Sequence, residues 1–328
     1  MKKIILAGAS IAALAMAAPA AAQSTSSVNQ TGNGNSADVS QENSNTSSVT
    51  QSGDNNVAGV DQTIGTGNTS TITQTATGAN EAGVFQNGLN STSTVTQSGD
   101  ASDDVAIVVQ DVLSDDATAT ITQTGNGGGS SSNIALIDQD NGSGSTASIT
   151  QSGLTNVAET IQEGSSNLSD VTQTGISGVV FVDQIGDGNT DLTIQGGDTN
   201  FADVNQGLVG AAVTGTTSTI FQDGDNNTAT VNQLADNNES FVDQGFSGGS
   251  FNVALVNQSG TGNFSGIEQG ASSVSSNNLA DVLQSGDDNT SFVSQNGDFN
   301  DADVDQATNG NFSDVVQSGN GNSASVSQ

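Results

Sequence analysis

The sequence predicts an all-β protein, a β-solenoid or cross-β stack of about thirteen strand-turn-strand rungs of about 22 residues each. Three observations carry this prediction. A glutamine recurs 26 times between Gln30 and Gln328, most often at a spacing of eleven residues. Side chains alternate with a period of two before each of these glutamines, and short links, often containing glycine, separate the alternating segments.

The segment before each glutamine predicts the strands. Two residues before the glutamine stands Val or Ile in 24 of 26 cases, four before stands Ser or Ala in 24, and six before stands Asn in 19, as in Asn56, Ala58, Val60 and Gln62. Only an extended strand directs such alternate residues to one face, whereas a helix scatters them around its axis. The glutamines expected to form a structural ladder with these residues are Gln51, Gln62, Gln74, Gln97, Gln151, Gln173, Gln206, Gln233, Gln258, Gln295 and Gln317.

The small residue four before the glutamine sets the length of the repeat. It alternates along most of the chain between Ser, as at Ser47 and Ser70, and Ala, as at Ala58 and Ala82. Two inequivalent strands therefore make one rung, and like strands stack on like. At a strand spacing of about 4.8 Å, stacked Asn and Gln amides hydrogen-bond along the stack while Val and Ile fill the space between two facing sheets.

The first 22 residues are expected to be a secretory signal peptide. Lys2 and Lys3 precede an apolar run from Ile4 to Ala18, and small residues lead to a cleavage site after Ala22. Residues 23–328 then form the repeat domain. Because no later stretch reaches about eighteen apolar residues, we expect an exported protein without stable membrane insertion.

Composition excludes several functional classes. The chain has 35 acidic residues, a formal net charge of −33, and no His, Cys, Tyr or Trp. Nucleic acid and anionic lipid are therefore poor partners, and the charge predicts self-repulsion that salt or acid weakens. No disulfide framework is available. No position combines a carboxylate pair with a basic or aromatic substrate platform, so we expect neither an enzyme nor a cofactor.

The repeated motif also resembles a known family. The spacing from Gln51-Ser52-Gly53 through Asn56 and Ala58 to Gln62 is similar to the repeat of curlin, the subunit of bacterial curli fibres, and it recurs across residues 24–328. This resemblance implies an extracellular, cell-surface amyloid fibre for adhesion and biofilm matrix. It implies a homopolymer as partner, with a nucleator subunit and an outer-membrane secretion channel. The chain departs from the family in having more repeats than usual and no Gly-rich export segment before them.

A structural fibre subunit needs ends that accept another copy, because unpaired strand edges template further strands. The sequence ends on the motif itself at Val326-Ser327-Gln328, and no terminal cap is visible in it. The residues expected to make the polymer contact are Val28, Gln30, Val39, Gln41, Val315, Gln317, Val326 and Gln328.

The alternative function is that of a monomeric β-solenoid, either a surface adhesin or an ice-binding protein. Threonine pairs support it because an ice-binding face is a flat array of threonines. The pairs are Thr69 with Thr71, Thr92 with Thr94, and Thr118 with Thr120. The array lapses where Leu168 and Asp170 take the equivalent positions, so it is short.

Several irregularities leave alternatives open. Asp191 and Thr193 take core positions while Leu192 and Ile194 take the alternate positions, so either a bulge corrects this rung or it buries a carboxylate and is the weakest one.

Insertions, such as 127–129 and Gly248-Gly249, are expected at rung corners. Corner aspartates such as Asp54, Asp187 and Asp287 are either calcium ligands or a solvated surface. The outward phenylalanines either form apolar stripes that bundle fibres or adhere to surfaces, or only reflect the β-propensity of phenylalanine on a sheet face. They are Phe85, Phe181, Phe201, Phe221, Phe241, Phe264, Phe292 and Phe312.

Overall fold

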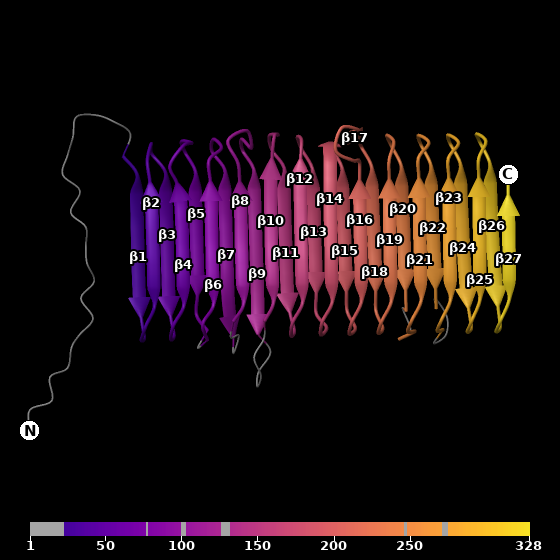
Figure 1. Cartoon of the computed structure of the whole chain (residues 1–328), viewed down its shortest axis with the longest axis horizontal. Coiled ribbons are helices and arrows are strands. Elements are labelled where there is room, and N and C mark those ends of the chain that lie inside the picture. The colour runs from indigo at the N-terminus through magenta and orange to yellow at the C-terminus, as the bar shows by residue number, and fades with distance from the viewer. Residues whose placement is uncertain (1–22, 77, 100–102, 126–131, 246–247, 271–274) are drawn as a thin grey trace, which may run out of the picture.

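The computed structural model describes residues 23–76, 78–99, 103–125, 132–245, 248–270 and 275–328. Within them every regular element is a β-strand, and the strands form two parallel sheets. Figure 1 shows one elongated body in which the chain advances from one end of the long axis to the other, with the links along its two long edges. The predicted all-β solenoid is confirmed.

Each sheet takes alternate strands of the chain. Sheet A contains β1 (Thr25–Thr31), β3 (Thr46–Ser52), β5 (Thr69–Gln74), β7 (Thr92–Gly99), β9 (Thr118–Gly125), β11 (Thr146–Ser152), β13 (Leu168–Gln173), β15 (Thr190–Gln195), β18 (Thr217–Gln222), β20 (Glu239–Gln244), β22 (Phe264–Gln269), β24 (Thr290–Asn296) and β26 (Phe312–Ser318). Sheet B contains β2 (Ser36–Gln41), β4 (Val57–Gln62), β6 (Glu81–Gln86), β8 (Val105–Gln110), β10 (Ile134–Asp140), β12 (Val157–Glu163), β14 (Val179–Asp187), β16 (Phe201–Gln206), β19 (Thr228–Gln233), β21 (Val253–Gln258), β23 (Leu279–Gln284), β25 (Asp301–Gln306), β27 (Ser323–Ser327) and the short β17 (Val213–Thr214), which pairs with β14 off the main path.

The stacking is in register throughout the described strands. Ser26 lies over Ser47 in sheet A, and Ala37 lies over Ala58 in sheet B, so like strands stack on like as the Ser and Ala alternation predicts. One rung is therefore one strand of sheet A followed by one strand of sheet B. Stacked glutamines are separated by 21 residues at Gln30 and Gln51 and by 29 at Gln110 and Gln139, yet the register is the same.

The core is the space between the two sheets. The residues at the second, fourth and sixth positions of the strands point into it, and Ala58, Val60 and Gln62 are 2%, 3% and 0% exposed. The aliphatic side chains form one continuous cluster along the stack, from Val49 to Val315. The core is thus thin and half polar, and it depends on hydrogen bonds as well as on apolar burial.

The corners absorb the differences in repeat length. Gly53 illustrates their tightness, since its φ is +116° and a Cβ placed there would lie 2.0 Å from the carbonyl oxygen of Ala76 in the next rung. The insertion before Gln222 forms β17, which adds to the end of β14 at Gly186 and Asp187. Gly248 and Gly249 lie at a corner between β20 and β21, as predicted, whereas the insertion at 127–129 lies outside the described residues.

In the part of the chain described, no helix has the length and apolar character needed to span a membrane.

Candidate functional site

Two glutamine ladders run the length of the described stack. In each, the Nε2 of one glutamine donates to the Oε1 of the glutamine in the following rung. The distances are 2.6–2.9 Å in sheet A, from Gln30 to Gln317, and 2.5–3.1 Å in sheet B, from Gln41 to Gln328. Because every bond points the same way, each ladder has a direction.

From Gln51 in sheet A and Gln62 in sheet B onward, the second amide hydrogen of the ladder glutamine joins the two sheets. Gln51 Nε2 donates to the carbonyl oxygen of Ser36 at 2.9 Å, and Gln151 Nε2 donates to that of Ile134, also at 2.9 Å. A buried carboxamide has two donors, and leaving either unpaired costs about 1–3 kcal/mol. This arrangement satisfies both, which explains why glutamine rather than another polar residue recurs at the sixth position.

The asparagines six residues before the glutamines pin the corners. Asn45 Oδ1 accepts the backbone N–H of Asn68 in the next rung at 2.9 Å, while its Nδ2 donates to the carbonyl oxygen of Gly65 at 3.0 Å. Asn35 acts in the same way towards Asn56 and Gly53. Where asparagine stands at this position, it can therefore tie its corner to the corner of the following rung.

The structure brings the predicted ladder residues together. Gln51, Asn56, Ala58, Val60 and Gln62 are buried between the sheets. The other glutamines named for the ladder share this environment and make the same stacked bonds: Gln74, Gln97, Gln151, Gln173, Gln206, Gln233, Gln258, Gln295 and Gln317.

The edge strands at the two ends of the described stack differ in exposure. At one end Val28 and Gln30 of β1 are exposed, and Val39 and Gln41 of β2 are half-buried. At the other end Val326 of β27 is half-buried and Gln328 is exposed. In contrast, Val315 and Gln317 of β26 are buried at 6% and 5%, and Ala324 and Val326 of β27 pack against the same core cluster.

The irregular rung contains a buried carboxyl group rather than a bulge. Asp191 pairs in register with Ser169 and Ser218 and is 1% exposed, so of the two alternatives the buried carboxylate is the one observed. Burial raises the pKa of Asp191 to about 8, opposed by the hydroxyl of Thr193, which donates to its carboxyl oxygens at 3.2 and 3.3 Å. Leu192 and Ile194 stay on the outer face.

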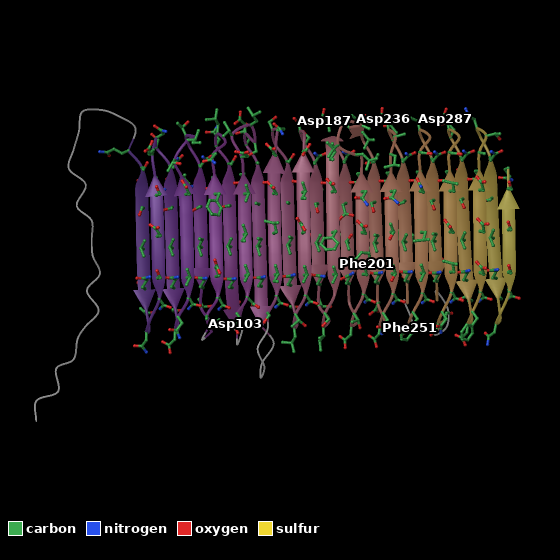
Figure 2. All side chains as sticks on the ribbon, viewed as in Figure 1. Asp103, Asp187, Phe201, Asp236, Phe251 and Asp287 are labelled. Carbon is green, nitrogen blue, oxygen red and sulfur yellow. The ribbon has the colours of Figure 1, made fainter. Side chains whose placement is uncertain are left out.

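The corner aspartates act mainly as hydrogen-bond acceptors. Figure 2 shows Asp187, Asp236 and Asp287 along one long edge and Asp103 and Phe251 along the other. Asp187 and Asp236 accept the backbone N–H of Ser165 and Thr214 in the preceding rung at 2.7 and 2.8 Å. The backbone N–H and hydroxyl of Thr261 lower the pKa of Asp287. Among the described residues no group of three or more acidic side chains could hold a metal ion.

The outward phenylalanines gather into groups, one of which Figure 2 marks at Phe201 on the face of the body. On sheet B, Phe181 and Phe201 contact edge to face with ring centroids 6.1 Å apart. On sheet A, Phe221 contacts Phe241 at 5.9 Å. Phe292 contacts both Phe264 at 5.2 Å and Phe312 at 6.1 Å. Phe85 is exposed on sheet B.

The threonines form a wider array than the pairs predicted. Over β3 to β11 on the outer face of sheet A, three in-register columns carry only Thr or Ser: Thr46, Thr69, Thr92, Thr118 and Thr146; Ser48, Thr71, Thr94, Thr120 and Ser148; Thr50, Thr73, Thr96, Thr122 and Thr150. The third column, directly before the glutamines, was not part of the sequence prediction, although its repetition is visible in the sequence.

Comparison with known proteins agrees with the geometry. The profile of the curlin associated repeat matches residues 43–75, 145–175, 217–245, 276–307 and 297–328. No curated protein is significantly similar to the chain. The matched segments lie in the N-terminal, central and C-terminal parts of the stack, and each contains the strands and ladder residues described above. The chain therefore contains segments in its N-terminal, central and C-terminal parts that match the curlin associated repeat.

Proposed function

We propose that this protein is the structural subunit of an extracellular curli-type fibre, which self-assembles by end-to-end stacking and serves cell adhesion and biofilm matrix. In this proposal residues 1–22 are removed on export and residues 23–328 enter the fibre. A nucleator subunit and an outer-membrane secretion channel of the curli type are its further partners. The observation that carries the proposal is the complementarity of the edge strands at the two ends of the described stack.

The backbone supports this complementarity. The N–H of Gln328 donates to the carbonyl oxygen of Asp305 in β25, and the carbonyl oxygen of Gln328 accepts from Ala307. Since backbone groups alternate along a strand, the N–H and C=O groups of Ser325 and Ser327 point away from β25. At the other end Ser36 donates to Asn56, so Ala37, Val39 and Gln41 direct theirs outward. A second copy stacked in register on β27 would pair these two sets.

The side chains support the same direction of stacking. At one end Gln30 and Gln41 donate through Nε2 to the following rung, so a preceding rung would be accepted through their Oε1 atoms. At the other end Gln317 and Gln328 each use one amide hydrogen towards a backbone carbonyl of the facing sheet, which leaves the second for a following rung. Head-to-tail contact would continue both ladders, whereas contact between two like ends would place donor against donor or acceptor against acceptor.

A proline at Ser325 tests the proposal. The substitution Ser325→Pro removes an outward N–H from an edge strand but no hydrogen bond within the chain. We expect the mature variant to fold with an unchanged circular dichroism spectrum, to fail to elongate from seeds, and to stop wild-type growth at substoichiometric amounts. Ser325→Ala, the matched control, keeps the N–H and should elongate normally. Wild-type protein that stays monomeric with seeds at high salt, or unimpaired growth of Ser325→Pro, contradicts the proposal.

The threonine array favours a second candidate function, binding to ice. Its hydroxyl columns repeat every ~4.8 Å along the stack and ~6.6 Å along each strand. Tetrahedral water with O···O distances of about 2.75 Å has second neighbours about 4.5 Å apart, close to the first repeat. Inhibition of ice recrystallisation by the wild type, lost in Thr94→Asp but kept in Thr230→Asp on sheet B, supports this candidate. No inhibition by the wild type excludes it.

A further inference from the structure

The outer face of sheet A over β18 to β26 carries a row of aromatic rings that the structural role does not use. Phe221, Phe241, Phe264, Phe292 and Phe312 stand on five successive strands of the sheet. Phe292 is 42% exposed, and the ring contacts within the row are edge-to-face or tilted rather than stacked. Ring faces in such contacts remain available to another flat group.

Two hollows lie along this row. The larger has a volume of about 500 Å³ and is lined by Ile194, Gly196, Phe221, Phe241, Asp223 and Asp243, with Gln222 completing its wall. The smaller, about 140 Å³, is lined by Phe241, Phe264, Phe292 and Glu268 around Gly266. Phe241 lines both, so the two hollows are neighbours on this face, and we name them together the aromatic groove.

Glycines keep the aromatic groove open. A Cβ at Gly266 would lie 3.1 Å from the ring of Phe292 and 3.3 Å from the ring of Phe264, so any side chain there would crowd the rings. Gly196 occupies the position after β15 beside the carboxylate of Asp223, 2.9 Å from where its Cβ would stand. The space between the aromatic rings and the acidic side chains is therefore created by the absence of two side chains.

The aromatic groove carries negative charge from its carboxylates, and no basic side chain of residues 4–328 balances it. Burial, with the nearby carboxylates of Glu268 and Asp223, raises the pKa of Asp243. Residues 4–328 contain no Lys, Arg or His, so the chain itself supplies no cation there. A positive ligand would relieve this repulsion and would also be attracted to the ring faces by the cation–π interaction.

We propose that the aromatic groove binds flat aromatic cations, with the ring system against Phe221 and Phe241 and the positive charge beside Asp223 and Asp243. The groove has the apolar lining and the few convergent polar groups typical of small-ligand sites. It lies on the outer face of one folded chain and exists without assembly. The proposal therefore stands independently of the fibre function.

The test uses thioflavin T, a benzothiazolium cation, titrated into the folded mature chain and followed by fluorescence and equilibrium dialysis. We expect Phe241→Leu to weaken binding about 5- to 10-fold through loss of the ring face. Asp243→Asn should weaken it about 3-fold and reduce its dependence on salt. Phe201→Leu, the matched control on sheet B, should leave the affinity unchanged.

Further measurements keep the outcomes separate. An uncharged analogue of the dye should bind more weakly than the cation to the wild type and equally to wild type and Asp243→Asn. Equal dye affinity of Phe241→Leu, Phe201→Leu and wild type would overturn the proposal, because the dye would then bind elsewhere. Assembly is followed by sedimentation without dye, so a failure of the fibre function and a failure of dye binding are distinguishable results.

Discussion

The buried carboxyl group of Asp191 makes a quantitative prediction about stability. Its pKa is raised from 3.8 to about 8 in the folded chain. Between these values the folded state binds more protons than the unfolded state, so the free energy of unfolding falls as pH rises through this window. At pH 7, which lies 3.2 pH units above the unfolded pKa of 3.8 and below the folded pKa, the stability lost relative to acid is about 4 kcal/mol, at 1.36 kcal/mol for each unit.

The substitution Asp191→Asn removes this loss while keeping an oxygen that can accept from Thr193. We expect the free energy of unfolding at pH 7 to rise by about 2–4 kcal/mol. The gain can fall short of the full 4 kcal/mol because the added amide hydrogens need partners in the core. The gain should shrink to nothing or reverse near pH 3. Urea unfolding followed by circular dichroism measures the total, and amide hydrogen exchange in β13, β15 and β18 localises it.

The control for this experiment is Asp170→Asn, which removes an exposed carboxylate from the neighbouring strand. It corrects for the general decrease in charge repulsion and should change stability by less than about 0.5 kcal/mol. If the free energies of unfolding of Asp191→Asn and Asp170→Asn change with pH in the same way between pH 4 and pH 8, the carboxyl group of Asp191 is not buried in the folded chain and the reasoning is wrong.

Three further predictions concern the ladders, the serine column and the surface charge. Gln173→Leu leaves the amides of Gln151 and Gln195 unpaired and should lower the free energy of unfolding by about 2–4 kcal/mol in urea, whereas Thr172→Ala on the outer face should cost less than about 1 kcal/mol. Ser93→Ala should raise the free energy of unfolding by about 1 kcal/mol, seen as a higher unfolding midpoint in urea. The reason is that the buried Ser93 hydroxyl has no hydrogen-bond partner among the described residues, and Ala119 already stands next to it in the same column. A lower free energy of unfolding would refute this prediction. The half-time of assembly, measured by light scattering, should shorten when salt is added and when the pH is lowered from 7 to 4. Burial raises the pKa of Asp138 and Asp183, so these two carboxylates lose their charge early as the pH falls. A half-time that depends on neither salt nor pH would exclude charge repulsion as the barrier to assembly.

The fold was predictable because one rung repeats and the repeat has two distinct strands. The period of two before each glutamine defined the inward face, and the Ser and Ala alternation defined which strand lies on which. The direction of the glutamine ladders was not predictable, because it depends on how each amide is oriented. The choice at Asp191 was also open, since a bulge and a buried carboxyl group have costs that sequence alone does not rank.

The aromatic groove had the weakest sequence signal. Phe221, Phe241 and Phe264 hold the fifth, third and first positions of their strands, so they form a diagonal that no single column reveals. Their proximity also depends on register being kept across links of different length. The short strand β17 is a similar case, because an insertion rich in Gly and Ala carries no pattern that predicts pairing with the end of β14.

The variable corners have a practical consequence for what the body can carry. Successive ladder glutamines stay aligned whether 21 or 29 residues separate them, so added length is accommodated outside the two sheets. A foreign peptide placed in such a corner should therefore be tolerated and displayed at the rim. With thirteen strands in sheet A at ~4.8 Å each, a polymer of such molecules would present the peptide about once every 60 Å, as a regular linear array.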